Sequence, residues 1–170
     1  MAVGDDGLRE AVERFMEWIY LSAVIGPGMQ DAEWASPLFT YLLTKKQYGS
    51  LKVICSRAGW PPPASRGITF YPHHIKHILT AREGKNSLSW QDCATILNAS
   101  LSSRSILAPH HAHDQQVFVL NSVDALSVGP TKEKYRGILI VETTINDLAP
   151  VTAYNAPEAK SRAILRRNGL

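Results

Sequence analysis

The chain has 170 residues, of which 45% are hydrophobic and 19% are charged. This composition excludes a disordered, collagen-like or fibrous chain and leaves enough apolar side chains to bury a core. The net charge is only +3, but its distribution is uneven: residues 1–60 hold seven acidic and six basic side chains, and residues 61–170 hold eight acidic and twelve basic ones. All six histidines also fall in the second part, where we therefore expect any polyanionic partner to bind.

The first part of the chain predicts helices. After Asp6, apolar residues recur every three or four positions until Gly26-Pro27-Gly28, which indicates one long amphipathic helix. A second helix is expected over about 36–48, followed by a short strand at Leu51–Cys55. The proline run 61–63 is typical of a stiff linker. We therefore place a boundary near residue 60, between an N-terminal helical segment (1–59) and a second unit (60–170).

The second unit predicts two helices followed by strands. A brief extended segment at 68–71 leads into a helix that begins at Pro72 and ends at about Arg82, where Gly84 stops it. Ser87 or Ser89 then caps another helix. Short apolar runs separated by turn residues predict three strands and a closing helix, at Val117–Leu120, Tyr135–Thr143, Pro150–Tyr154 and 157–167. This order predicts an α+β fold: N-terminal helices, then two helices packed on one face of an antiparallel β-meander.

The two cysteines and the termini bear on the compartment. Cys55 and Cys93 lack the spacing of a zinc ribbon or a disulfide scaffold, so we expect buried, reduced thiols. No stretch reaches the ~18 uninterrupted apolar residues of a membrane span, and the first residues lack the pattern of a signal peptide. These features favour a cytoplasmic protein without a membrane partner.

The histidines form two groups, and both could take part in the same chemistry. His73 and His77 lie one turn apart on one face of the predicted helix, with His74 toward its buried side. A second group, which consists of His110, His111 and His113, precedes the first predicted meander strand. Zinc is one interpretation, because imidazoles one helical turn apart are a ligand pattern. The helix lacks the glutamate of a metallohydrolase, however, and we expect no metal or other cofactor.

The same residue types suit metal-free cleavage of RNA. Attack of a 2′-hydroxyl on its own phosphate needs a base, an acid and cations around phosphorus, and histidine serves either proton role near neutral pH. Lys132, Lys134 and Arg136 alternate at the start of the long strand, so all three are expected on one face as a phosphate clamp. Thr152 and Tyr154 also share a strand face, where their hydroxyls can donate to phosphoryl oxygens.

Two motifs carry a resemblance to a known superfamily. The helix reads "HHIKHIL" followed by "AR", and the last strand reads Thr152-Ala153-Tyr154 within "PVTAYNAP". In their order and spacing, residues 68–168 resemble the phage-associated branch of the barnase/EndoU/colicin/RelE-like nuclease superfamily. The resemblance implies that His77 is the active-site helix histidine, that Thr152 and Tyr154 contribute from the last strand, and that Arg82, Lys134 and Arg136 bind phosphate.

One departure from that pattern concerns the second proton-transfer group. Superfamily members usually carry a second histidine soon after the first, whereas this chain has Arg82-Glu83-Gly84. We therefore expect His111 or His113 to take its place, and His73 to bind RNA beside His77.

The leading hypothesis is a metal-independent endoribonuclease, acting as a toxin or phage effector on RNA such as tRNA and leaving a 2′,3′-cyclic phosphate. The alternative is a non-catalytic phage or bacterial binding or inhibitor module on a nuclease-like fold, with a host protein, an inhibitor or nucleic acid as its partner. A zinc-binding protein is the third reading. The N-terminal segment has three open roles, which are packing against the basic unit, oligomerisation and shielding of the active site.

Overall fold

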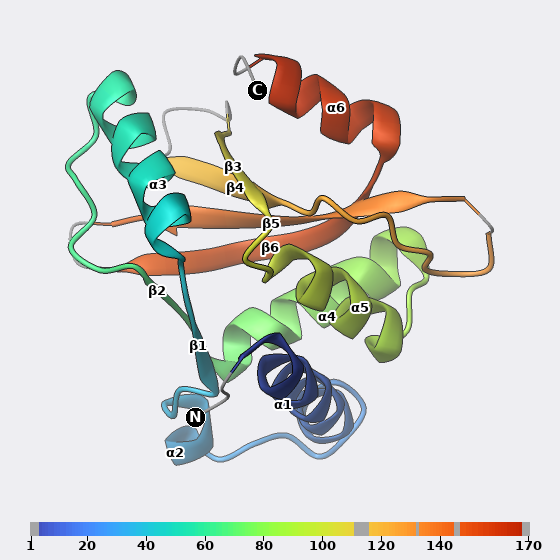
Figure 1. Cartoon of the computed structure of the whole chain (residues 1–170). Coiled ribbons are helices and arrows are strands. Elements are labelled where there is room, and N and C mark those ends of the chain that lie inside the picture. Colours follow the sequence, from blue (N-terminus) through green and yellow to red (C-terminus); the bar gives the residue numbers. More distant parts are fainter. Residues whose placement is uncertain (1–3, 111–115, 132, 145–146, 168–170) are drawn as a thin grey trace.

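A six-stranded, mostly antiparallel sheet organises the chain in the computed structural model (Figure 1). The structure describes residues 4–110, 116–131, 133–144 and 147–167. The elements follow in the order α1 (Gly4–Ile19), a π-helical segment η1 (Tyr20–Val24), α2 (Asp31–Trp34), β1 (Phe39–Leu42), α3 (Lys45–Ala58), β2 (Gly67–Phe70), α4 (Pro72–Asn86), α5 (Trp90–Ser100), β3 (Ile106–Pro109), β4 (Val117–Asn121), β5 (Tyr135–Thr143), β6 (Leu148–Pro157) and α6 (Glu158–Arg167).

The strand order is β1-β2-β6-β5-β4-β3. Strands β3 to β6 form an antiparallel meander, and β1 pairs antiparallel with β2. The two parts join where β2 runs parallel to β6, at the pair Ile68 and Leu148. The predicted α+β fold, the meander and its three predicted strands are therefore confirmed, as are the helices now labelled α1, α4, α5 and α6.

The prediction was wrong between residues 36 and 58. The helix expected over 36–48 is instead strand β1 with the start of α3, and the strand expected at Leu51–Cys55 lies inside α3. Phe39 and Tyr41 face the core, while Thr40 and Leu42 face outward, so burial here alternates with the two-residue period of a strand although Leu42 is apolar. Thr44 then begins α3, because its hydroxyl accepts a hydrogen bond from the Gln47 backbone N–H.

Two further details differ from expectation. Strand β3 was not predicted, and Gly84 does not stop α4, which continues to Asn86 and ends with Ser87 in a left-handed conformation. Ser89 does cap α5, since its hydroxyl accepts from the backbone N–H of Asp92. Pro72 occupies the first turn of α4 as expected.

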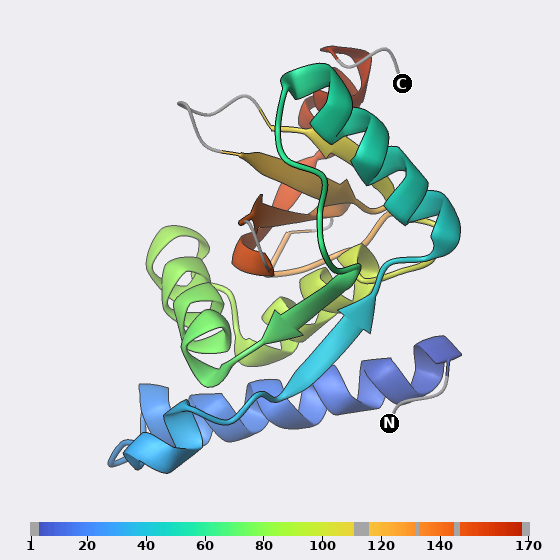
Figure 2. The same ribbon diagram turned by 90° about the vertical axis from the view of Figure 1, so that its left-hand side faces the viewer.

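Helices lie on both faces of the sheet. Figures 1 and 2 show α4 and α5 against one face with α1 beneath them, and α6 on the opposite face. The two helices expected on one face, α4 and α5, do share it, and α6, for which no face was predicted, covers the other (Figure 1). Its position is held by Ser161, whose hydroxyl donates to Asn121 Oδ1 at 2.8 Å while Asn121 Nδ2 donates to the Ser161 carbonyl at 3.4 Å.

A buried glutamine ties α3 to the rest of the molecule. Gln47 is 3% exposed, and its Nε2 donates to the carbonyls of Ser102 and Ser105 just before β3. Its Oε1 accepts from the hydroxyl of Tyr41 at 2.8 Å. Because every polar atom of this side chain has a partner, its burial is compatible with a stable core.

The main core crosses the boundary that we expected near residue 60. Val12 and Leu51 from the first part pack in the same buried cluster as Ile78 and Leu139 from the second. The division into 1–59 and 60–170 therefore runs through a shared core, and its meaning as a domain boundary stays a prediction. Cys55 and Cys93 are buried, free thiols as expected, and burial raises the pKa of Cys93 to about 12.

Helix α5 approaches β5 most closely at Gly137. A Cβ at this position would lie 2.7 Å from the Ile96 carbonyl oxygen and 2.8 Å from Ser100 Oγ. The Gly137 backbone N–H also donates to Ser122 Oγ at 2.8 Å. Position 137 therefore requires glycine for space, and the contact sets how near the helical layer lies to the sheet.

Gly137→Ala is expected to destabilise the fold by about 1–3 kcal/mol, because the added methyl group overpacks the contact between α5 and β5. Gly84→Ala is the matched control: nothing lies within 4 Å of its added Cβ, and alanine in a helix interior stabilises by roughly 0.5–1 kcal/mol. Urea unfolding of both variants measures the difference. A Gly137→Ala protein as stable as the wild type would contradict the close approach.

Candidate functional site

Tyr154 on β6 lies beside two basic side chains from different helices. Arg82 Cζ of α4 is 5.8 Å from the centre of the Tyr154 ring, and Lys160 Nζ of α6 is 4.8 Å from it. Arg82 reaches this strand because β2 pairs with β6 only at Ile68 and Leu148, and α4, which directly follows β2, contacts β6. The fold thus brings together two residues that the sequence analysis had assigned to one site, Arg82 and Tyr154.

Arg82 is a buried cation without an acidic partner. Its residue is only 7% exposed, and its Nη1 donates to Asn86 Oδ1 at 2.7 Å while its Nε has no hydrogen-bond partner. No ion pair within the described ranges involves Arg82. Burial lowers the pKa of its guanidinium, and the neighbouring Cys93 and Tyr154 act in the opposite direction. An unpaired buried charge is costly, so this position favours an anionic ligand.

Two polar side chains of β6 are also buried without partners. They are Thr152, through Oγ1, and Asn155, through Oδ1. Thr152 shares a strand face with Tyr154, whereas Asn155 lies on the other face, opposite Gly137 in the ladder. Buried polar atoms without partners are rare and need a physical explanation. Here all three such atoms lie on β6 or on the residue of α4 that meets Tyr154.

A small pocket opens between α6 and the sheet at Tyr154. Its volume is about 150 Å³, and its lining includes His110, Tyr154, Lys160 and Arg167. Ligand pockets usually measure about 300–1,000 Å³, so this one suits a single small group of a larger ligand. Burial raises the pKa of Tyr154, which Arg82 partly offsets, so the phenol stays protonated at neutral pH and can donate a hydrogen bond.

The helix histidines His73 and His77 do not lie at this pocket. His73 and His77 are exposed on α4, and neither belongs to the pocket lining that the structure describes. His77 precedes Arg82 by five residues, which turns its side chain about 140° around the helix from Arg82. His111 and His113, expected to supply the second proton-transfer group, lie outside the described residues. The histidine that lines the pocket is their neighbour His110.

Of the three basic residues predicted to form a phosphate clamp at the start of the long strand, the two that the structure describes do not act together. β5 begins at Tyr135, so Lys134 precedes the strand and is exposed, while Lys132 lies outside the described residues. Arg136 is within the strand, but its Nη2 forms an ion pair with Glu158 Oε1 at 3.0 Å. Its charge therefore helps to hold the start of α6.

Sequence reasoning missed His110 and Lys160 as site residues. His110 was recognised only as a member of its histidine group, and Lys160 only as part of the closing helix predicted at 157–167. These residues reach Tyr154 or β6 through the fold, which their spacing in the chain does not indicate.

His74 has a structural role at the start of α4. Its Nδ1 accepts a hydrogen bond from the Tyr71 backbone N–H at 3.0 Å, and its ring centre is 3.9 Å from that of His73. Burial lowers the pKa of His74 to about 4, and the nearby His73 and His77 add to this shift. The neutral ring therefore caps the helix, which explains one member of the first histidine group without catalysis.

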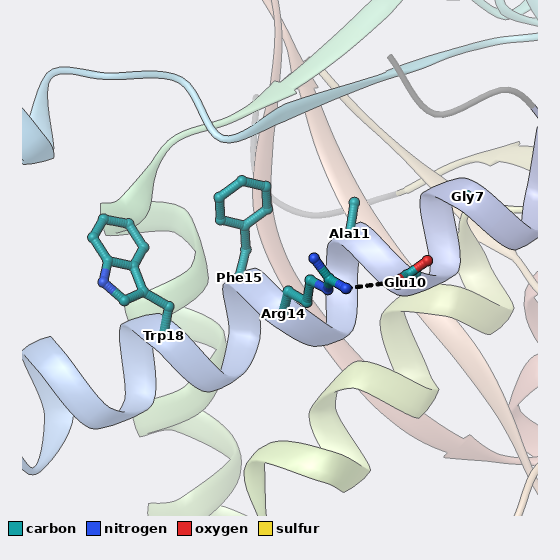
Figure 3. A pocket seen from close by; sticks show the side chains of 6 residues that line it. All are labelled: Gly7, Glu10, Ala11, Arg14, Phe15 and Trp18. Atoms are coloured by element: carbon teal, nitrogen blue, oxygen red, sulfur yellow. Dashed lines mark ion pairs between the residues drawn. The ribbon is translucent and has the colours of Figure 1, made fainter.

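A wider hollow on α1 carries no comparable chemistry. It measures about 490 Å³ and lies along a single helix, where Phe15 and Trp18 adjoin the ion pair between Glu10 and Arg14 (Figure 3). That ion pair is exposed and within one helix, so its charges satisfy each other. Arg82 does not itself line the smaller pocket, but the Tyr154 ring that it contacts does, and this neighbouring buried charge makes the smaller pocket the better candidate site.

Comparisons with known proteins gave no match to any family model, curated protein or solved structure. Within the described ranges, no group of three or more histidine, cysteine, aspartate or glutamate side chains is arranged to hold a metal ion. No helix in the described part of the chain is long and apolar enough to cross a membrane. The resemblance to the nuclease superfamily stays a prediction.

The stability of the protein is expected to fall as pH decreases from 6.5 to about 4, partly because the unfolded chain protonates His74 over this range and the folded one does not. His74→Gln keeps an acceptor for the Tyr71 N–H but removes the titration. The variant should therefore lose less stability between pH 7 and pH 4.5, measured by urea unfolding. Protonation of carboxylates destabilises both proteins alike, so it cancels in the comparison. An equal loss of unfolding free energy in both proteins would therefore contradict the lowered pKa of His74.

Proposed function

We propose that the protein is an endoribonuclease that cleaves RNA without a metal ion and holds the reacting phosphate at Arg82 and Tyr154. The observation that carries the proposal is the buried guanidinium of Arg82, which has no carboxylate partner in the described part of the chain and lies beside Tyr154. A phosphodiester would supply the missing negative charge. Guanidinium groups also match phosphate oxygens in geometry, which favours this anion over a simple halide.

The surroundings support a polymeric substrate. The pocket at Tyr154 has room for one small group and includes Arg167 in its lining, and α6 also carries the exposed Arg166 and Arg162, the latter 3.8 Å from Glu158. One phosphate would enter the pocket while neighbouring phosphates follow the basic helix. Lys160 and the Thr152 hydroxyl would add donors around the bound phosphate without any metal.

The proposed reaction is an intramolecular transesterification. The 2′-hydroxyl oxygen attacks phosphorus and loses its proton to His110, while the bond from phosphorus to the 5′-oxygen breaks and that oxygen takes a proton from the Tyr154 phenol. The products are a 2′,3′-cyclic phosphate and a free 5′-hydroxyl. Arg82 and Lys160 stabilise the additional charge on the phosphorane. His77, the residue that the resemblance implies, is the competing proton-transfer group.

Binding without cleavage is the second candidate function. Cleavage needs an efficient base and an efficient acid, and the described part of the pocket offers a single histidine and a tyrosine with a raised pKa. This small set of proton-transfer groups favours binding alone. The anion-binding argument from Arg82 applies equally to such a module, with nucleic acid as its partner. Salt-dependent RNA binding with no product formation would identify it.

Arg82→Met is expected to weaken RNA binding by about ten- to a hundredfold, because a charge-assisted contact to phosphate is lost. The thermal midpoint should stay unchanged or rise, since the substitution removes a buried, unpaired charge. Lys85→Met, an exposed position on the same helix, is the control and should bind nearly as the wild type does. Fluorescence anisotropy of a labelled RNA measures binding. A large fall in the thermal midpoint with binding retained would make Arg82 a structural residue.

Tyr154→Phe and His110→Asn are each expected to slow RNA cleavage by about 10²–10⁴-fold, because each removes one proton-transfer group. His77→Asn should retain cleavage, since this side chain is exposed away from the pocket. Gel analysis of tRNA and single-stranded RNA in EDTA, with circular dichroism as the folding control, distinguishes these outcomes. Loss of cleavage in His77→Asn alone would assign the proton transfer to the helix histidine and refute the role of His110.

A further inference from the structure

A second pocket lies where α4, α5 and the π-helical segment η1 meet. Its volume is about 380 Å³, within the range of small-molecule sites, and it shares no lining residue with the pocket at Tyr154. Its lining includes the buried apolar side chains of Leu79 and Leu88. Tyr20, Trp90 and Glu83 also line it, together with Ser87 and Ser89.

Irregular backbone shapes the walls of this pocket on two sides. Tyr20 begins η1, and π-helical turns in proteins occur frequently at functional sites. On the other side, Ser87 has φ 54°, and among the described residues it is the non-glycine residue with a positive φ. The Ser87 N–H donates to the Glu83 carbonyl at 3.1 Å and the Leu88 N–H to the Arg82 carbonyl at 3.3 Å, which turns the chain sharply into α5. Such strain persists where surrounding structure holds it, and it often accompanies function.

The lining selects for a particular kind of ligand. Tyr20 and Trp90 are half-buried and pack against the core, so they present aromatic surface that is already ordered. Glu83 is exposed at the rim and can only accept hydrogen bonds when ionised. Two leucines, two aromatic side chains, the hydroxyls of Ser87 and Ser89 and the Glu83 carboxylate as the charged acceptor fit a planar ring that carries an N–H₂ donor at its edge.

The charge of the surroundings distinguishes a neutral ring from an ion. Glu83 opposes an anion, whereas the N-terminus of α5, which begins at Trp90, carries the positive end of the helix dipole and opposes a cation. We therefore propose that this pocket binds a nucleobase with an exocyclic amino group, turned out of an RNA strand. The inference rests on RNA as the substrate of the proposed function and adds a base-recognition site to it. Arg82 and Glu83 are consecutive residues of α4 that face about 100° apart, so one strand can contact both.

The test uses nucleosides, which lack the phosphate that Arg82 would bind. Isothermal titration of the full chain compares adenosine with purine riboside, which differs only by the missing amino group. Adenosine should bind saturably and at least about tenfold more tightly than purine riboside, because the latter leaves the Glu83 carboxylate unpaired. Glu83→Gln should remove most of this difference, whereas Glu17→Gln, an exposed position on α1, should preserve it.

Three results would overturn the inference: no saturable binding of adenosine, equal affinity for both nucleosides, or the same preference in Glu83→Gln as in the wild type. Binding of spermidine but not of adenosine would reassign the pocket to organic cations and also overturn it. Arg82→Met separates the two proposals, because it should lose RNA binding and keep adenosine binding. RNA binding without adenosine binding therefore defeats only this inference. Adenosine binding without RNA binding defeats the proposed function and reassigns the pocket to a free nucleoside.

Discussion

The close approach of α5 to β5 at Gly137 is the constraint on which the arrangement of the site depends. Because no side chain separates the strand from the Ile96 carbonyl and Ser100, the helical layer lies directly against the sheet. Only two residues besides the cap at Ser89 connect α4 to α5, so α4 is carried to the edge of β6. Strand β2 pairs with β6 at Leu148 and does not continue along β6 toward Tyr154. Arg82 can therefore approach β6 at Tyr154. Steric contact in the core thus positions a charged residue at its edge.

The site that results is unfavourable for stability and favourable for binding. Among the described residues, Arg82 is buried without a carboxylate partner, and Thr152, on the same strand face as Tyr154, buries a hydroxyl that lacks a hydrogen bond. Elsewhere in the same protein, buried polar side chains have hydrogen-bond partners, as Gln47 and the pair Asn121 and Ser161 show. Unpaired polar atoms concentrated at one strand are therefore best understood as places for a ligand. The contrast within one molecule is the main physical support for an anion site.

Much of the fold could be predicted from the sequence, and part of the site as well. The three-to-four-residue period before Gly26, the cap at Ser89 and the apolar runs of the meander each act locally, and the structure confirms the elements that they predict. The region 36–58 failed because its apolar residues fit helix and strand periods equally, and pairing with β2 decided the outcome for β1. Arg82 and Tyr154 were recognised as candidates, but the positions of His77 and Arg136 relative to them were not readable from the chain.

By itself, the sequence determined the helices and strands whose signals act within a few residues: the periodicity of α1, the cap of α5, the proline that starts α4 and the runs that become β4, β5 and β6. Only the tertiary structure decided that α6 covers the opposite face, that Arg136 pairs with Glu158, and that Arg82 and Lys160 both meet Tyr154. The physical reason is that these contacts join residues far apart in the chain. They depend on strand pairing and on helix packing at Gly137, and neither is encoded in local spacing.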